Sequence, residues 1–135
     1  EAFDTGHLWL AKQLVSEGII PEPVLVQLCM GVPWGAPDDL NTFMAMVNNV
    51  PQGWTFSAFG IGRSELPYVA AAVLAGGNAR VGLEDNLWLG KGQLARNEDL
   101  VERAVGIIEG MGARVIGPAD VRMRLGLTKR APVAA

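Results

Sequence analysis

Short apolar runs alternate along this chain with longer segments in which apolar residues recur every three or four positions. The short runs predict buried strands and the longer segments predict helices that face a core. Strands that alternate with helices at these spacings are typical of βα units with right-handed crossovers and a parallel sheet, so the predicted fold class is α/β. The predicted strands cover 24–30, 54–59 and 78–84, and the predicted helices cover 6–17, 37–47, 64–77, 97–111 and 118–125.

Turn formers and polar residues mark the predicted helix ends. Gly18 follows the first helical segment in the manner of a C-cap, and the pair at 76–77 ends the third. Pro37 suits the first position of the second helix. Ser64 and Asn97 are the predicted N-caps of the third and fourth helices.

The segment 78–86 carries the candidate chemistry. It reads as a buried strand that ends in two adjacent carboxylates, Glu84 and Asp85. Alternation along a strand places Arg80, Gly82 and Glu84 on one face, and polar side chains that point inward near a barrel mouth are typical of an active site there. Arg80 and Asp85 have opposite parity, so a direct pair between them requires a bend, for which Gly82 is the best place.

Length limits the architecture. The chain has 135 residues, half of them hydrophobic, which suits one core and a single unit over 1–135. A closed (β/α)8 TIM barrel needs about 250 residues. Phe3 and Asp4, directly before the first helix, read as the end of a further strand, so the chain is predicted to start within a fold. We therefore expect the C-terminal half of such a barrel, from about the end of strand five to strand eight plus the terminal helices.

Composition excludes some function classes. Eleven basic and fourteen acidic residues are dispersed and give a net charge of −3, which predicts no nucleic-acid partner and no membrane partner. No apolar run reaches the roughly 18 residues of a membrane span and the N-terminus lacks a signal-peptide pattern, so a cytoplasmic location is predicted. Cys29, the single cysteine, is predicted to be a small buried hydrophobe rather than a reactive thiol.

A glycine loop between the second strand and the third helix is a second candidate site. Gly60, Gly62 and Arg63 could hold a phosphate through backbone N–H groups at a helix start, although a plain tight turn explains the same residues. Trp34, in the loop after the first strand, could form a wall of a substrate site or pack at a barrel rim or subunit contact.

Several motifs together resemble the β-keto acid cleavage enzymes, the family that includes 3-keto-5-aminohexanoate cleavage enzymes. The most specific is Arg80-Val81-Gly82-Leu83-Glu84-Asp85-Asn86-Leu87, and the similarity extends over most of the chain. The supporting segments are Gly76-Gly77, Gly90-Lys91-Gly92, Asn97-Glu98-Asp99-Leu100-Val101-Glu102, Phe3-Asp4-Thr5-Gly6-His7-Leu8, Gly60-Ile61-Gly62-Arg63, Pro118-Ala119-Asp120-Val121-Arg122 and Leu125-Gly126-Leu127.

The resemblance implies a zinc-dependent barrel that exchanges acyl groups between a β-keto acid and acetyl-CoA, giving acetoacetate and a new acyl-CoA. By this resemblance Glu84 is a zinc ligand, and Asp85 is the base, with Arg80 as its partner. The family's other zinc ligands form a His-x-His pair, whereas the only histidine here is His7, which we interpret as a capping or packed residue. An N-terminal half-barrel would then supply that pair, and the exposed edges of a half-barrel predict a homo-oligomer or an assembly with that half.

Two other classes of function remain open from the sequence. The chain could be a small non-catalytic α/β module that binds a phosphorylated ligand or a protein partner. It could also be an interaction fragment without a small-molecule ligand. Neither class requires Arg80 and Glu84 near the end of one strand.

Overall fold

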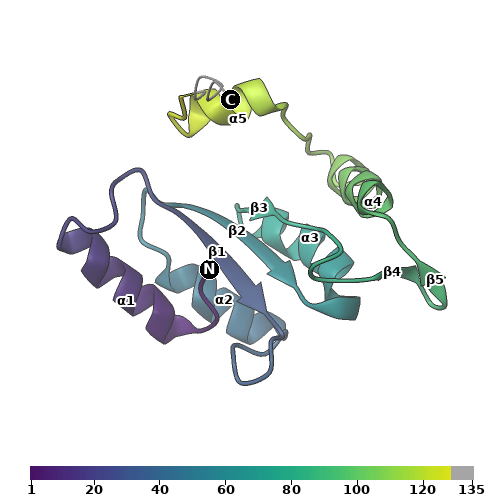
Figure 1. Ribbon diagram of the computed structural model, residues 1–135, viewed down its shortest axis with the longest axis horizontal. Helices are drawn as coiled ribbons and strands as arrows, with labels where there is room; N and C mark the ends of the chain where they lie inside the picture. The colour runs from purple at the N-terminus through teal and green to yellow at the C-terminus, as the bar shows by residue number, and fades with distance from the viewer. Residues whose placement is uncertain (129–135) are drawn as a thin grey trace, which may run out of the picture.

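The computed structural model describes residues 1–128, and strands alternate with helices as predicted. Three parallel strands form a sheet in the order β1-β2-β3 (Figure 1). These strands are β1 (Leu25–Met30), β2 (Thr55–Gly60) and β3 (Asn78–Ala79), and the helices before and between them are α1 (Thr5–Ser16), α2 (Leu40–Asn49) and α3 (Glu65–Leu74). The remaining elements are the 3-10 helix η1 (Gly62–Ser64), the strands β4 (Trp88–Gly90) and β5 (Gln93–Leu94), and the helices α4 (Asn97–Gly110) and α5 (Pro118–Arg124).

The core lies between one face of the sheet and the first three helices. Val26, Leu28 and Met30 alternate along β1 and are buried in one cluster with side chains of α1, α2 and α3. Within it the rings of Phe43 and Tyr68 meet edge to face, with centroids 5.2 Å apart. Figure 1 shows α1 and α2 on one side of the molecule and α4, which packs against α3, on the other.

The first residues of the chain add a short parallel segment beside β1. Ala2 forms a bridge with Leu28, with its N–H donating to the Gln27 carbonyl at 2.7 Å and its carbonyl accepting from the Cys29 N–H at 3.0 Å. The predicted strand end at Phe3 and Asp4 is therefore reduced to a single bridge at Ala2, after which Phe3 and Asp4 lead into α1. An α/β arrangement of this kind, with parallel strands and intervening helices, matches part of a (β/α)8 barrel.

The predicted strand over 78–84 is wrong beyond Ala79. The Gly82 N–H donates to the Glu65 carboxylate at 2.6 Å and the Leu83 N–H donates to the Asn97 side chain at 2.9 Å, so neither extends a strand ladder. The alternation predicted for Arg80 to Glu84 consequently ends, and the segment turns instead.

Two predicted helix starts also need correction. Pro37 lies before the second helix, because the Asp39 side chain accepts from the Thr42 N–H at 3.0 Å and fixes the start of α2 at Leu40. Asn97 is the first residue of α4 and not its cap, since its side-chain oxygen is used by residue 83. Ser64 does precede α3 as predicted, but its hydroxyl donates to Asp38.

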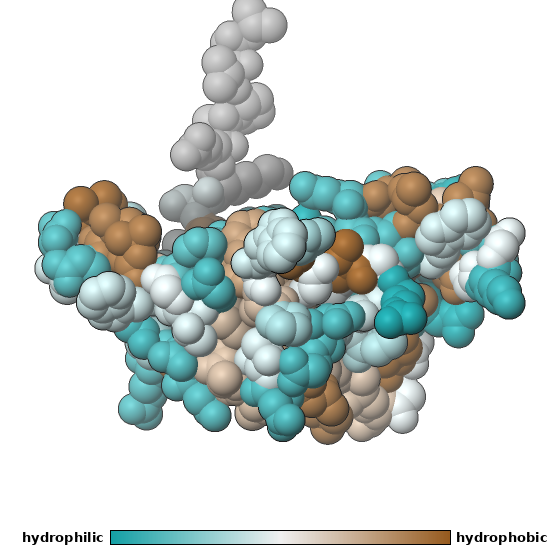
Figure 2. Space-filling model, turned by 90° about the horizontal axis from the view of Figure 1, so that it is seen from below, coloured by the Kyte–Doolittle hydropathy of each residue, from teal (hydrophilic) through white to brown (hydrophobic). Residues whose placement is uncertain are grey.

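The antiparallel hairpin of β4 and β5 was not predicted. It lies on the same side of the molecule as α4 (Figure 1), and Trp88 of β4 is exposed. On the face seen in Figure 2, hydrophobic residues form several separate patches among hydrophilic ones. Large exposed apolar side chains include Trp9, Leu10, Leu25 and Trp34. Within residues 1–128, no helix combines the length and the apolarity that crossing a bilayer would require.

Candidate functional site

A tight turn directly after β3 carries the two predicted carboxylates. The Arg80 N–H reaches the Ala58 carbonyl at 3.4 Å, at the edge of the sheet. The chain then bends at Gly82, whose carbonyl accepts from the N–H groups of Asp85 at 3.0 Å and Asn86 at 3.1 Å. Gly82 is therefore the point of the bend, as the sequence predicts.

Arg80 contacts both carboxylates of this turn. Its Nε donates to Asp85 Oδ2 at 2.9 Å and its Nη2 donates to Asp85 Oδ1 at 3.1 Å, which is the bidentate geometry that suits a guanidinium and a carboxylate. Nη2 also donates to Glu84 Oε2 at 2.7 Å. The predicted direct pair of Arg80 with Asp85 is confirmed in this structure.

The strands fix the guanidinium from the remaining directions. Arg80 Nη1 donates to Gln27 Oε1 of β1 at 3.0 Å and to the Glu1 carboxylate. Its central carbon lies 4.2 Å from the centre of the Phe59 ring of β2, a cation–π contact. Arg80 is thus held by three segments of the chain and holds Asp85 in turn.

The two neighbouring carboxylates have different surroundings. The Asp85 side chain is 3% exposed and the Glu84 side chain is 83% exposed. Burial raises the pKa of the Asp85 carboxyl, and the Arg80 guanidinium opposes that rise. A buried carboxylate with a raised pKa suits proton transfer, whereas an exposed carboxylate with a free oxygen suits contact with a ligand.

A third carboxylate, which the sequence analysis missed, supports the turn from below. Glu65 is fully buried at the start of α3, and it accepts hydrogen bonds from the Gly82 N–H at 2.6 Å and from Asn86 Nδ2 at 3.1 Å. Burial raises the pKa of Glu65. A glutamate in the first turn of a helix is ordinarily interpreted as an exposed residue that interacts favourably with the helix dipole. The sequence therefore contains no signal that Glu65 is buried and supports the turn.

Comparisons with known proteins show the family of the chain. The model of the beta-keto acid cleavage enzyme family matches residues 1–127. The chain belongs to this family. The resemblance seen in the sequence is thereby confirmed.

Curated relatives of the family cover nearly all of the chain. It is 74% identical over 130 residues to a 3-dehydrocarnitine:acetyl-CoA trimethylamine transferase of Rhizobium meliloti, which covers 96% of this chain and 43% of the relative. It is 35% identical to a 3-keto-5-aminohexanoate cleavage enzyme of Fusobacterium nucleatum, over 96% of this chain and 47% of the relative. It is 33% identical to a 3,5-dioxohexanoate:acetyl-CoA acetone transferase of Paraburkholderia graminis, over 94% of this chain and 43% of the relative. The chain thus spans less than half the length of these curated relatives.

The glycine loop has a structural explanation for both glycines. A Cβ at Gly60 would lie 2.8 Å from the Tyr68 ring, and Gly62 has a positive φ of 61°. The Ile61 N–H donates to the Met30 carbonyl at 3.0 Å and the Gly62 N–H donates to the Asp85 carbonyl at 2.7 Å. These two N–H groups are therefore used within the chain, and the Arg63 side chain is the part of this loop that is open to a ligand.

Metal ligands are few in the part of the chain that the structure describes. No three side chains of His, Cys, Asp or Glu gather there in an arrangement that could hold a metal ion. His7 instead caps the start of α1, since its Nδ1 accepts from the Phe3 N–H at 3.0 Å. Glu84 Oε2 accepts a hydrogen bond from Arg80, and its Oε1 accepts none among residues 1–128.

Cys29 is buried, as predicted. Burial and the nearby Glu1 carboxylate raise the pKa of its thiol to about 11. A neutral, buried thiol of this kind packs as a small apolar side chain.

Proposed function

We propose that this chain forms the C-terminal half of a (β/α)8 barrel that cleaves β-keto acids with acetyl-CoA as co-substrate. The names of its relatives, which include acetyl-CoA transferases and β-keto acid cleavage enzymes, support the reaction class. The reaction would exchange acyl groups, so that a β-keto acid and acetyl-CoA give acetoacetate and a new acyl-CoA. The observation that carries this proposal is the turn after β3, where Arg80 joins Asp85 and Glu84.

Asp85 is the proposed base. Its burial favours acceptance of a proton from the carbon between the keto group and the carboxylate of the substrate. Arg80 would orient Asp85 and keep its carboxylate ionised before the proton is transferred. The deprotonated carbon would then form a bond with the acetyl carbon as the thiolate of CoA leaves. The thiolate would next add to the original keto carbon, the bond from that carbon to the α-carbon would break, and the released enolate would take back a proton to give acetoacetate and the new acyl-CoA.

Glu84 is the proposed zinc ligand that this chain supplies. When bound, zinc would polarise the keto oxygen and stabilise the negative charge that develops there. One carboxylate cannot hold the ion alone, so the remaining ligands would come from a His-x-His pair in an N-terminal half-barrel. We also propose that the assembled enzyme is a homo-oligomer and cytoplasmic.

The 74% identity to a protein named for 3-dehydrocarnitine favours a particular substrate class. 3-Dehydrocarnitine is a β-keto acid with a trimethylammonium group. We therefore propose a quaternary ammonium β-keto acid as the substrate. Turnover by the complete enzyme is compared with that of the neutral tert-butyl counterpart, and equal kcat/KM values for the two compounds would contradict this substrate class.

The test compares two variants of the complete enzyme. We expect Glu84→Gln to lose zinc and activity together, because an amide is a poorer and uncharged ligand. We expect Asp85→Asn to retain zinc and to lose exchange of the α-hydrogens of the keto acid with heavy water. Zinc content is measured by mass spectrometry and exchange by deuterium incorporation, with the exposed Glu109→Gln as the control.

If the Asp85→Asn enzyme still exchanges α-hydrogens at the normal rate, the assignment of Asp85 as the base is wrong. If the Glu84→Gln enzyme retains its full zinc content, the assignment of Glu84 as a zinc ligand is wrong.

A further inference from the structure

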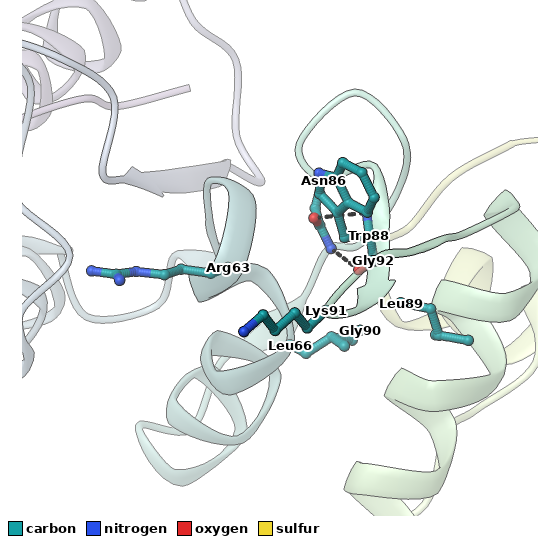
Figure 3. A pocket seen from close by; sticks show the side chains of 8 residues that line it. All are labelled: Arg63, Leu66, Asn86, Trp88, Leu89, Gly90, Lys91 and Gly92. Atoms are coloured by element: carbon teal, nitrogen blue, oxygen red, sulfur yellow. Dashed lines mark hydrogen bonds between the residues drawn. The ribbon is translucent and has the colours of Figure 1, made fainter.

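An open hollow lies between the start of α3 and the β4–β5 hairpin, next to the acidic turn. Its volume is about 390 Å³, within the range of about 300–1,000 Å³ typical of small-molecule pockets. Figure 3 shows Lys91 reaching from the hairpin toward the start of α3, whereas Arg63 extends from the loop after β2 with its guanidinium directed away from the hairpin. The lining residues are Arg63, Leu66, Asn86, Trp88, Leu89, Gly90, Lys91 and Gly92.

The walls combine two positive charges with an apolar surface. Neither Arg63 nor Lys91 forms an ion pair among residues 1–128, so both cations are available to an anion. Leu66 and Leu89 contribute apolar surface, and Trp88 is a large aromatic residue that is 49% exposed. An anionic ligand with a flat apolar group fits this combination, because phosphates pair with cations and aromatic rings stack on an indole.

The hollow is built on a braced part of the chain. The Asn86 side chain accepts from the Trp88 N–H at 3.0 Å and donates to the Trp88 carbonyl at 2.7 Å, as the dashed lines in Figure 3 mark. Asn86 Nδ2 also donates to the buried Glu65. Asn86 therefore lines the hollow and directly follows Asp85 in the chain, whereas the buried Asp85 side chain faces Arg80.

We propose that the hollow binds the nucleotide end of the CoA co-substrate. This proposal rests on the proposed function. Lys91 pairs with the phosphates, the exposed Arg63 side chain turns toward them when the ligand binds, and Trp88 provides the surface for the adenine ring. The turn at Gly90 and Gly92 has no side chains that would block a close approach of the ligand to the backbone. The pantetheine arm then runs past Asn86 toward the acidic turn.

The neighbouring hollow beyond Leu89 is a poorer candidate for a phosphate. It is lined by Asp99 and Glu102 together with Arg103. Two carboxylates there disfavour a polyanion. This difference makes Arg103 a useful control, because it is an arginine on the same side of the molecule that serves a different hollow.

The first experiment measures binding to the chain itself, with adenosine 3′,5′-bisphosphate as the probe. Calorimetry of the 135-residue chain is compared with that of Lys91→Gln, Arg63→Gln and Arg103→Gln. We expect each of the first two changes to weaken binding by about tenfold, since each removes a charge-assisted hydrogen bond, and Arg103→Gln to leave it unchanged. No binding, or equal loss in the Arg103 variant, would overturn the site.

The second experiment separates this site from the chemistry. In the complete enzyme, the KM for acetyl-CoA is compared with the KM for acetyl-pantetheine, which lacks the nucleotide. We expect Lys91→Gln and Trp88→Leu to raise the KM for acetyl-CoA by about tenfold and to leave the values for acetyl-pantetheine unchanged. Equal effects on both thioesters would overturn the proposal. An enzyme that turns over neither thioester, with the nucleotide probe still bound, would instead remove the proposed function and leave the binding site in place.

Discussion

Replacement of Glu65 by alanine is expected to damage the site without removing any group that would touch the substrate. The Gly82 N–H would lose its acceptor, and an unsatisfied buried donor costs about 1–3 kcal/mol. Asn86 would keep a partner in the Trp88 carbonyl, so its loss is smaller. The space left by a fully buried side chain adds about 1–2 kcal/mol, and relief of a buried charge offsets part of it.

The net expectation for Glu65→Ala is a free energy of unfolding lower by about 2–4 kcal/mol. Urea denaturation of the chain, followed by circular dichroism, measures it. In the complete enzyme, the turn that carries Asp85 would shift, and a displacement of about 1 Å at a reacting group can lower a rate by about a hundredfold. Deuterium exchange at the keto acid measures that effect while zinc content reports on Glu84.

Glu65→Gln and Glu98→Ala complete this experiment. The glutamine keeps an acceptor for the Gly82 N–H and should recover most of the stability and the exchange rate. Glu98 is also a glutamate in the first turn of a helix, but it is exposed, and its change should alter stability by less than about 0.5 kcal/mol. If Glu65→Ala behaves like Glu98→Ala, the turn does not depend on the buried carboxylate.

The pH dependence of Glu65 has a defined sign. Burial raises its folded-state pKa above the ordinary value of 4.5, so the charged form is penalised in the folded protein at neutral pH. The penalty is relieved as the pH falls through the raised pKa toward 4.5. The native chain should therefore gain stability relative to Glu65→Gln as the pH is lowered, and a difference that is flat or of opposite slope would show that the carboxylate is not desolvated.

Three further predictions concern the chain alone. Its unpaired strand edges should make it associate with itself or with an N-terminal half-barrel, and a stable monomer in analytical ultracentrifugation with protected strand amides would contradict this. It should bind zinc weakly, because Glu84 is the one proposed ligand it supplies, and tight stoichiometric binding in calorimetry would reveal an unrecognised site. Cys29, whose thiol pKa is about 11, should react slowly with a disulfide reagent at pH 8 until denaturant exposes it, so rapid native labelling would be inconsistent with its burial.

Hydrophobic periodicity predicted most of the fold because β1, β2 and the helices α1 to α3 each bury one face in the same core. The strands at 25–30 and 55–60, and the helices that follow them, lie within a few residues of their predicted bounds. The family resemblance singled out Arg80, Glu84 and Asp85, and the structure brings these three together.

Long-range hydrogen bonds explain what the sequence could not predict. The segment after Ala79 has strand-like composition, but its N–H groups are taken by side chains of two helices that are distant in sequence. The burial of Glu65 depends on the same tertiary contact. Local patterns contain no trace of such pairings, and this is why both the early end of the strand and the third carboxylate were missed.

The loop after β2 and the acidic turn after β3 are joined by two hydrogen bonds, from Gly62 N–H to the Asp85 carbonyl at 2.7 Å and from Gly82 N–H to Glu65 at 2.6 Å. The conformation of the motif at 80–86 consequently depends on residues outside the motif. A protein engineer who grafted these seven residues onto another scaffold would transfer the reactive groups without their support, and would need residues 61–65 as well. By the same reasoning, an insertion in the loop after β2 would disturb a carboxylate more than twenty residues further along the chain.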